Sequence, residues 1–446
     1  MTYEEYMNTL ENQIKNKKAK DLVRQEFENH IEEQAESYEA EGLDRETALT
    51  EAIRQMGDPV KTGKELNQIH RPKFPLRLFS LAIILTIFGI YMQGIIFYHI
   101  DRYYNIRPVN GQSIWVLPPA AYLAGTVFFN LLGLILILGM LYFNYNYFVK
   151  FIFVFYGIYV CVIAAGNFII LDYDTYWTFN YSLWMVYPLI FAGLLYRFRN
   201  RGVRGIFICE GLTLIVFLTK ILFPGSAALS SASLECYVVI VLLLFLAIIK
   251  GIFGFSKKPL YAAGCLMFTP LLSLCLLPSL PEYYTARLKA LLRFFTGKNL
   301  EGEGYYLVNL LRENIPQYSL FGGSTLPDYI DQSELHSNFM LTSVFSWFGV
   351  IPGLFVITLL VVFCILALKT AMHQQNRIGM LLGNACGISM LVRILAYIFS
   401  NFGYGAYYTI SIPFLPYGGV NILLNALYVG FVLCIFRNTN ILREEC

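Results

Sequence analysis

Apolar segments of membrane-spanning length alternate with short polar stretches from residue 74 to residue 437. A helix needs roughly 20 apolar residues to cross the ~30 Å hydrocarbon core of a bilayer. We therefore predict an all-α polytopic membrane domain over residues 74–440, with about ten transmembrane helices. The predicted spans cover residues 76–98, 118–142, 148–170, 181–197, 203–222, 232–251, 259–279, 338–369, 378–400 and 415–437.

Residues 1–73 follow a different pattern, because charged residues occur throughout and apolar residues recur at helical spacing. The apolar stripe between Leu22 and Tyr38 predicts one amphipathic helix. Gly42 ends this helix, and Asp44 is placed to cap the next one. We expect a small cytoplasmic domain of three or four short helices, in which no catalytic group is recognisable.

The composition agrees with a membrane protein and narrows its chemistry. Charged residues make up 14% of the chain, against about 25% in a soluble domain. The net charge of +3 combines an acid-rich N-terminal segment with a sparsely charged, basic remainder, so no nucleic-acid partner is expected. The nine cysteines are scattered without a CxxC or Cys/His cluster, so we expect neither a disulfide framework nor a metal site.

Positively charged residues gather in alternate loops of the predicted membrane domain. Arg197, Arg199, Arg201 and Arg204 lie between spans four and five. By the positive-inside rule, this loop, the other basic loops and both termini face the cytoplasm. The opposite loops are rich in aromatic residues, and the loop over about residues 280–337 is long and carries both charge signs. Loops of this length are often functional.

Two short motifs stand in the C-terminal third of the sequence. His-Ser-Asn-Phe at residues 336–339 leads into span eight, and Pro-Phe-Leu-Pro-Tyr-Gly-Gly at residues 413–419 precedes span ten. Their order resembles the shape, elongation, division and sporulation (SEDS) family, to which RodA, FtsW and SpoVE belong. That family has ten spans, a large outer loop between spans seven and eight, a His-Thr-Asp-Phe motif entering span eight and a Leu-Pro-Phe-x-Ser-Tyr-Gly-Gly-Ser motif before span ten. The resemblance covers roughly residues 75–440, while residues 48–66 resemble the helical prefix domain found ahead of some permeases and division-type proteins.

The resemblance implies a glycosyltransferase of the bacterial plasma membrane that acts in cell shape, division or sporulation. Its substrate would be lipid II, the undecaprenyl-diphosphate-linked peptidoglycan precursor, polymerised on the outer membrane face. Its partner would be a transpeptidase of the class B penicillin-binding-protein type. In that family the aspartate of the His-Thr-Asp-Phe motif is the proposed general base, which accepts the proton of the attacking sugar hydroxyl. No cofactor is implied, although carboxylates facing a diphosphate would suit a divalent cation.

The position of the family's aspartate is Asn338 in this chain. An amide donates and accepts hydrogen bonds but does not act as a base near neutral pH. Further departures concern the same predicted pocket, with Pro416 and Val420 in place of serines and Arg393 in place of a glutamine. Whether the chain is an enzyme therefore stays open.

Three interpretations of Asn338 remain. The chain binds the lipid-linked precursor or a partner without polymerising, or a nearby carboxylate replaces the aspartate on the same helical face, or the chain is a scaffold for a transpeptidase. A flippase or transporter of the precursor is a further alternative. The catalytic candidates are Asn338, Glu334 and Asp331, and the predicted substrate-binding residues are Arg287, His336, Arg393, Pro413, Phe414, Tyr417, Gly418 and Gly419.

Arg393 lies in the middle of span nine. A charge at the centre of a bilayer costs at least ~2.5–3.5 kcal/mol on insertion scales. We therefore expect this side chain to face the bundle interior or a polar cavity, beside a substrate diphosphate or a carboxylate. Glu210 and Glu235 are the candidate carboxylates, and a purely structural ion pair is the alternative.

Overall fold

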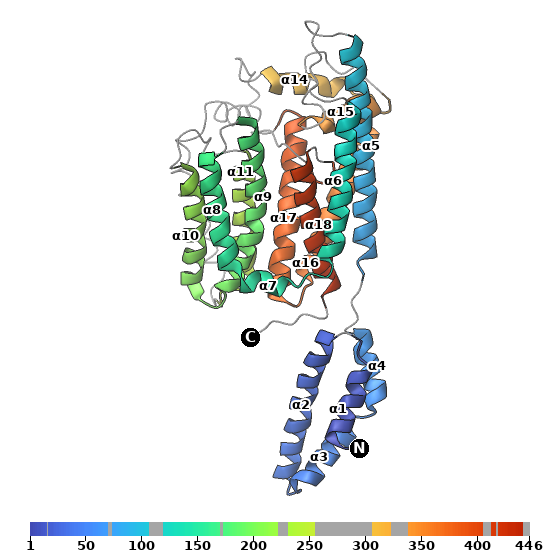
Figure 1. Cartoon of the computed structure of the whole chain (residues 1–446), viewed down its shortest axis with the longest axis vertical. Helices are drawn as coiled ribbons and strands as arrows, with labels where there is room; N and C mark the ends of the chain where they lie inside the picture. The colour runs from blue at the N-terminus through green and yellow to red at the C-terminus, as the bar shows by residue number, and fades with distance from the viewer. Residues whose placement is uncertain are drawn as a thin grey trace. The chain divides into compact units, whose positions relative to one another are not determined.

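The computed structural model describes residues 1–15, 17–69, 74–106, 119–169, 173–221, 231–254, 306–322, 338–404, 412–415 and 418–439. Every regular element in these residues is a helix, which confirms the predicted all-α class. The chain divides into two units, one formed by Met1–Phe74 together with Phe436–Cys446 and one running from Pro75 to Ile435 (Figure 1).

The described residues of the N-terminal unit form four helices, α1 (Tyr3–Asn12), α2 (Lys17–Ala40), α3 (Arg45–Gln55) and α4 (Pro59–Ile69). Asp44 caps α3 as predicted, because its carboxylate accepts the backbone N–H of Thr47 at 3.2 Å. α2 packs on α3, and α1 packs on α4. The core between these helices consists of buried apolar side chains: Tyr6, Met7, Leu10, Ile14, Val23, Ile31, Ala35, Ala48, Ala52 and Ile53.

The membrane unit is a bundle of long apolar helices. Its described helices are α5 (Leu76–Ile106), α6 (Pro119–Met140), α7 (Tyr145–Lys150), α8 (Ile152–Ile169), α9 (Tyr173–Arg197), α10 (Gly202–Ile221), α11 (Ser231–Ile249), α14 (Tyr306–Asn314), the 3-10 helix η4 (Ile315–Gln317), α15 (Met340–Phe348), α16 (Val350–Met372), α17 (Arg377–Asn401) and α18 (Gly419–Arg437). Seven of them, α5, α6, α10, α11, α16, α17 and α18, are long and apolar enough to cross a membrane. The predicted span over residues 259–279 lies outside the described residues, so the count of ten stays a prediction.

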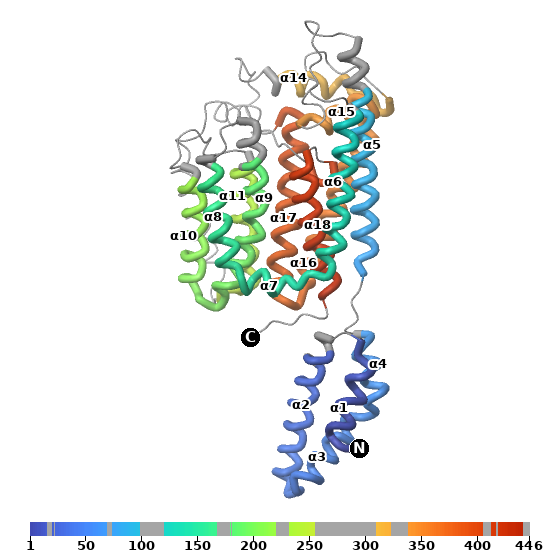
Figure 2. Tube along the Cα trace, in the orientation of Figure 1, coloured from blue at the N-terminus to red at the C-terminus, as the bar shows by residue number. Residues whose placement is uncertain are grey.

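α17 lies in the middle of the membrane unit (Figure 1 and Figure 2). It packs against α16, α9 and α11, and 78% of its membrane-spanning window is buried inside the protein. α6 lies at the periphery, with only 11% of its window buried. Polar side chains of α17 therefore face protein, whereas α6 lies on the surface of the membrane unit.

The sequence predicts one span over residues 338–369, and the structure corrects this to two helices that break at Gly349. Gly349 has a φ of +94°, a conformation that side chains disfavour. α15 is consequently a short, largely buried helix, and α16 alone has the length of a span. Pro352 lies in the first turn of α16, where its missing N–H costs no hydrogen bond.

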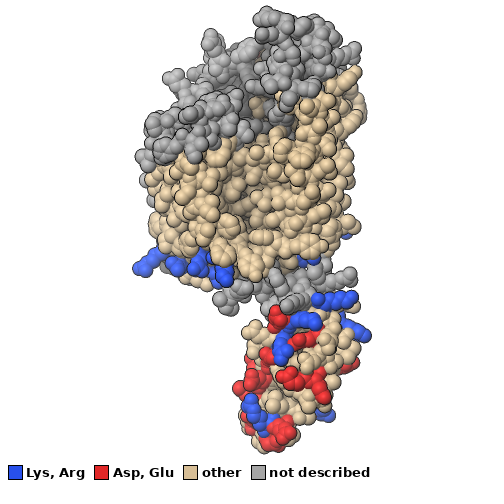
Figure 3. Space-filling model, in the orientation of Figure 1, with Lys and Arg blue, Asp and Glu red and all other residues tan. Residues whose placement is uncertain are grey.

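Lys and Arg side chains gather along the edge of the membrane unit opposite α14 (Figure 3). Arg199 and Arg201 lie in the turn between α9 and α10. This turn is joined to the end of α11, because the Asn200 N–H donates to the Ile252 carbonyl at 3.0 Å. The basic loops predicted to face the cytoplasm thus lie along one edge of the membrane unit. Which side of the membrane this edge faces stays a prediction.

Candidate functional site

Asn338 lies two residues before α15, and α15 lies at the same end of the membrane unit as α14 (Figure 1). Its backbone carbonyl accepts a hydrogen bond from Asn401 Nδ2 at 3.1 Å. Its side-chain Oδ1 is buried without a hydrogen-bond partner among the described residues. The position is therefore held by its backbone, and its side-chain oxygen is one of the few buried polar atoms in the described residues without a partner.

Two side chains of α17 fix the start of α15. Asn401 Oδ1 accepts from both the backbone N–H and the hydroxyl of Thr342, each at 3.0 Å. The Tyr397 hydroxyl accepts the backbone N–H of Met340, also at 3.0 Å. The first N–H groups of a helix have no partner within it. Asn401 and Tyr397 therefore cap α15 and set the position of Asn338.

Neither Tyr397 nor Asn401 is among the predicted site residues. The signal in the sequence is weak, because it consists of two polar groups four residues apart near the end of an apolar span. Their role depends on α15 being a separate helix whose first turn needs caps. A single continuous span over residues 338–369 would have no separate first turn at Met340 that needs caps.

Asn401→Ala is expected to lower the stability of the purified protein by about 1–3 kcal/mol, because Thr342 loses a buried acceptor. Hydrogen exchange at the first turn of α15 should also become faster. Thr358→Ala is the control, since the exposed Thr358 hydroxyl bonds the Leu354 carbonyl within its own helix. Unchanged exchange at α15 in Asn401→Ala would contradict the capping role.

Arg393 points into the bundle, as predicted for a charge in mid-span, and its side chain is only 3% exposed. Nη2 donates to Asn425 Oδ1 at 2.9 Å, and the guanidinium lies 5.2 Å from the centroid of the Tyr428 ring. Glu235 lines the same small cavity, and its Oε1 is buried without a hydrogen-bond partner among the described residues. The Arg393 guanidinium and the Glu235 carboxyl group thus line one small cavity between α17 and α11.

The cavity beside Arg393 has a volume of about 20 Å³. A site needs roughly 10–15 Å³ of such volume to hold one water molecule, so this cavity has room for a water and not for a diphosphate. Of the two partners expected for Arg393, the carboxylate fits this geometry. Glu210, the other candidate, is buried in α10 but does not line this cavity.

The turn before α18 packs closely against α5. Phe414 has a φ of +68°, and its ring meets Phe363 of α16 edge-to-face with the centroids 4.7 Å apart. A Cβ atom at Gly89 of α5 would collide with the Phe414 carbonyl oxygen. The glycine in α5 is therefore what allows the turn to approach.

The two glycines of the second motif have local structural roles. Gly418 adopts a φ of +86°. Gly419 begins α18, and a Cβ there would lie 2.5 Å from the Phe129 ring of α6. Together with Pro413, which is buried, these residues shape the entry into α18.

Only some of the predicted site residues can be placed. Asn338 is bonded to Asn401 at the end of α17, whereas Arg393 is a residue of α17 itself. Arg393 lies eight residues before Asn401, which is about 12 Å along a helix at ~1.5 Å per residue. They therefore occupy different depths of the bundle. Five predicted residues lie outside the described part of the chain: Arg287, Asp331, Glu334, His336 and Tyr417.

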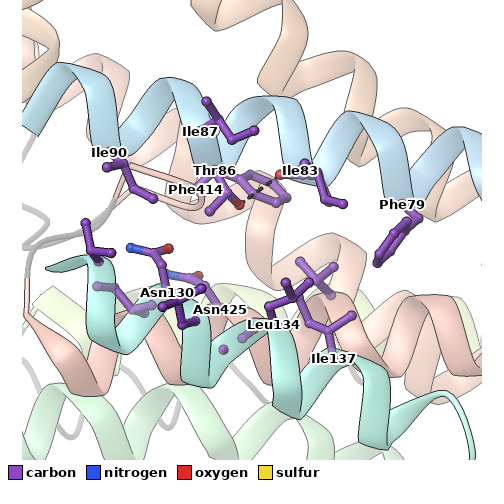
Figure 4. A pocket seen from close by; sticks show the side chains of 17 residues that line it. Phe79, Ile83, Thr86, Ile87, Ile90, Asn130, Leu134, Ile137, Phe414 and Asn425 are labelled. Atoms are coloured by element: carbon purple, nitrogen blue, oxygen red, sulfur yellow. Dashed lines mark hydrogen bonds between the residues drawn. The ribbon is translucent and has the colours of Figure 1, made fainter.

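A separate cavity of about 250 Å³ lies between α5, α6, α18 and Phe414 (Figure 4). Most of its lining is aliphatic, and its polar side chains are Thr86, Asn130 and Asn425. Thr86 and Asn130 donate to carbonyls of their own helices, and Asn425 is bonded to Arg393. Because this groove lies within membrane-spanning helices and is mostly apolar, it suits a hydrocarbon chain better than a soluble substrate.

Comparison with known proteins shows similarity in fold but not in sequence. No family model matches the sequence, and no curated protein matches it significantly. Among solved structures, one chain from work on the coordination of polymerization and crosslinking by a peptidoglycan synthase complex is similar with a TM-score of 0.58 and 14% identity. The match covers 82% of this chain and 98% of that one.

The rod shape-determining protein RodA of Thermus thermophilus gives the same result. A crystal structure of its aspartate-to-alanine mutant has a TM-score of 0.53 and 13% identity, over 82% of this chain and 98% of RodA. A second RodA structure matches with a TM-score of 0.53 and 12% identity, over 82% and 97%. The structural similarity establishes a shared fold, and the low sequence identities support nothing more specific. The shared fold agrees with the resemblance carried by the two motifs. The chain is an integral membrane protein with the fold of RodA.

Proposed function

We propose that this chain is a SEDS-type membrane protein of peptidoglycan synthesis that binds an undecaprenyl-diphosphate-linked glycan precursor. The observation that carries the proposal is the fold shared with RodA and with a chain from a peptidoglycan synthase complex. Each match covers 82% of this chain and 98% of the other chain. The order of the two C-terminal motifs supports it independently, since it is read from the sequence. The N- and C-termini are proposed to be cytoplasmic, which places Asn338 toward the outer face.

The groove between α5, α6 and α18 supports a lipid-borne substrate. It is bounded by the Phe414 turn at the level of Gly89 and by aliphatic side chains of α6 such as Leu134. Few residues of α6 are buried, so a chain in the bilayer can reach the groove from the side. We propose that the hydrocarbon chain of the precursor lies here while its diphosphate-sugar head reaches the region of Asn338.

Asn338 favours binding without polymerisation in the wild type. Glycosyl transfer needs a group that takes the proton of the attacking hydroxyl, and a carboxamide does not do so near neutral pH. Asn338 as a residue is only partly buried, and a carboxamide can donate and accept hydrogen bonds with a sugar head group. A transpeptidase of the class B penicillin-binding-protein type is the proposed partner, because one similar chain comes from a peptidoglycan synthase complex.

The test is polymerisation of lipid II by the purified full chain in nanodiscs, with and without such a transpeptidase. We expect no polymer from the wild type or from Asn338→Ala, and polymer from Asn338→Asp, which restores a carboxylate. Wild-type polymer that disappears in Glu334→Gln would instead make the chain an enzyme with a relocated base. Absence of both polymer and lipid II binding in all variants would leave only the scaffold role.

A further inference from the structure

The described part of the long loop, residues 306–322, is attached to the membrane unit at two points. Arg312 of α14 donates from Nε to the Gly403 carbonyl at 2.9 Å, and its guanidinium lies 4.9 Å from the Tyr404 ring centroid. Residues 319–322 form the second attachment, at the break between α15 and α16. We call residues 306–322 the strap.

The second attachment caps the first turn of α16. The Val350 N–H donates to the Ser319 carbonyl at 2.9 Å, and the Ile351 N–H donates to the Leu320 carbonyl at 3.2 Å. The first N–H groups of a helix otherwise lack partners, so these bonds replace a conventional side-chain cap. Gly349 makes the approach possible, because a Cβ there would lie 2.7 Å from the Leu320 oxygen.

The backbone of the strap tip is held from several directions. Gly322 N–H donates to the Phe348 carbonyl at 3.1 Å, and the Ser319 hydroxyl lies within hydrogen-bonding distance of the Phe321 and Gly322 carbonyls. The Tyr318 ring packs near Phe345, with the centroids 5.8 Å apart. Burial raises the pKa of Tyr318 to about 12, so this side chain stays neutral at physiological pH.

This geometry holds two large apolar side chains away from the protein. Leu320 is 68% exposed and Phe321 is 69% exposed, although apolar side chains of this size normally seek burial. Their backbone is bonded to the first turn of α16, which begins the candidate span Val350–Met372. The pair therefore lies at the N-terminal end of that candidate span.

The surface next to the pair is apolar and exposed. Ile351, Leu354 and Phe355 in the first turns of α16 are exposed, and only 33% of the α16 window is buried. Leu320 and Phe321 thus extend a lipid-facing surface outward from the end of the helix. Aromatic and aliphatic side chains at this level partition into the membrane–water interface.

We propose that Leu320 and Phe321 insert into the bilayer interface at the N-terminal end of α16 and anchor the strap to lipid. The occupant of this surface is the bilayer, because the exposed pair continues the lipid-facing side of α16. The anchor keeps the strap, and with it α14, at the membrane surface beside α15 and Asn338. This inference depends on residence in a membrane and not on the proposed enzymatic or binding role.

The test uses Phe321→Trp in nanodiscs of phosphatidylcholine brominated near the top of the acyl chains. The fluorescence of the new tryptophan, obtained as the difference between variant and wild-type spectra, should be blue-shifted. The brominated lipid should quench it as strongly as in Ile351→Trp, a control at an exposed position of α16. Leu43→Trp in the N-terminal unit should add emission that bromine quenches much less. Unquenched, red-shifted emission from Phe321→Trp would overturn the proposal.

A second measurement controls for the possibility that the tryptophan substitution changes the conformation of the strap. A photoreactive benzoylphenylalanine at position 321 keeps an aromatic side chain and should give phospholipid adducts on illumination in native-like nanodiscs. Adducts to protein alone, with or without an added transpeptidase, would show that the pair is covered by protein and would also overturn the proposal. Mass spectrometry of the peptide containing residue 321 separates these outcomes.

Discussion

Gly89→Ala is expected to unfold at a markedly lower temperature than the wild type. The added Cβ would collide with the Phe414 backbone carbonyl, which is part of a turn and cannot rotate away as a side-chain end can. Overpacking of this kind typically costs about 1–3 kcal/mol, and more when backbone must move. Melting of the purified protein, followed by size-exclusion chromatography after heating in one detergent, measures the effect.

Gly94→Ala is the matched control, because it makes the same change five residues further along α5. The nearest atoms to a Cβ at Gly94 are the Leu123 methyl groups at 3.8 Å, an ordinary van der Waals distance. Alanine is favoured over glycine in a helix by about 1 kcal/mol, so this variant should be as stable as the wild type or more stable. Equal melting of the two variants would contradict the close approach of the Phe414 turn to α5.

Arg393→Met is expected to destabilise the protein by about 1–3 kcal/mol, the cost of leaving a buried polar group without its hydrogen-bond partner. Asn425 would lose a donor at 2.9 Å, and Glu235 would be left in the same small cavity without a nearby positive charge. Adding Glu235→Gln should then recover part of the loss, because the uncompensated carboxylate is removed. A double-mutant cycle of thermal stability measures this coupling.

The control for this cycle is Glu210→Gln in the Arg393→Met background. Glu210 is also a buried carboxylate in a span, but it does not line the Arg393 cavity. The second substitution should therefore give no recovery. Recovery by Glu210→Gln, or none by Glu235→Gln, would mean that the charge partner of Arg393 has been assigned wrongly.

Hydropathy alone predicted the parts of the fold that depend on burial in lipid. The all-α class and the apolar helices α5, α6, α10, α11, α16, α17 and α18 follow from runs of residues that water would not tolerate. The interior position of Arg393 also follows, since a mid-span charge that faced lipid would be costly. The Asp44 cap was predictable because it depends only on neighbouring residues.

The details that position Asn338 depend on contacts between distant segments. The break at Gly349 is stabilised by the carbonyls of Ser319 and Leu320 from a different part of the chain. The capping of α15 by Asn401 joins residues 59 positions apart. Hydrophobic periodicity reports which side of a helix is apolar, but it carries no information on such pairings.

The most direct test of the proposed function is binding of lipid II to the wild-type chain, measured by native mass spectrometry from nanodiscs. We predict a bound precursor that polyprenyl diphosphate displaces and that excess phospholipid does not. Leu134→Phe, which fills the groove between α5, α6 and α18, should weaken binding severalfold. Leu138→Phe, the same change one turn further along α6 on an exposed position, should bind like the wild type. Absence of a lipid II complex in the wild type, or equal binding by both phenylalanine variants, would contradict the account.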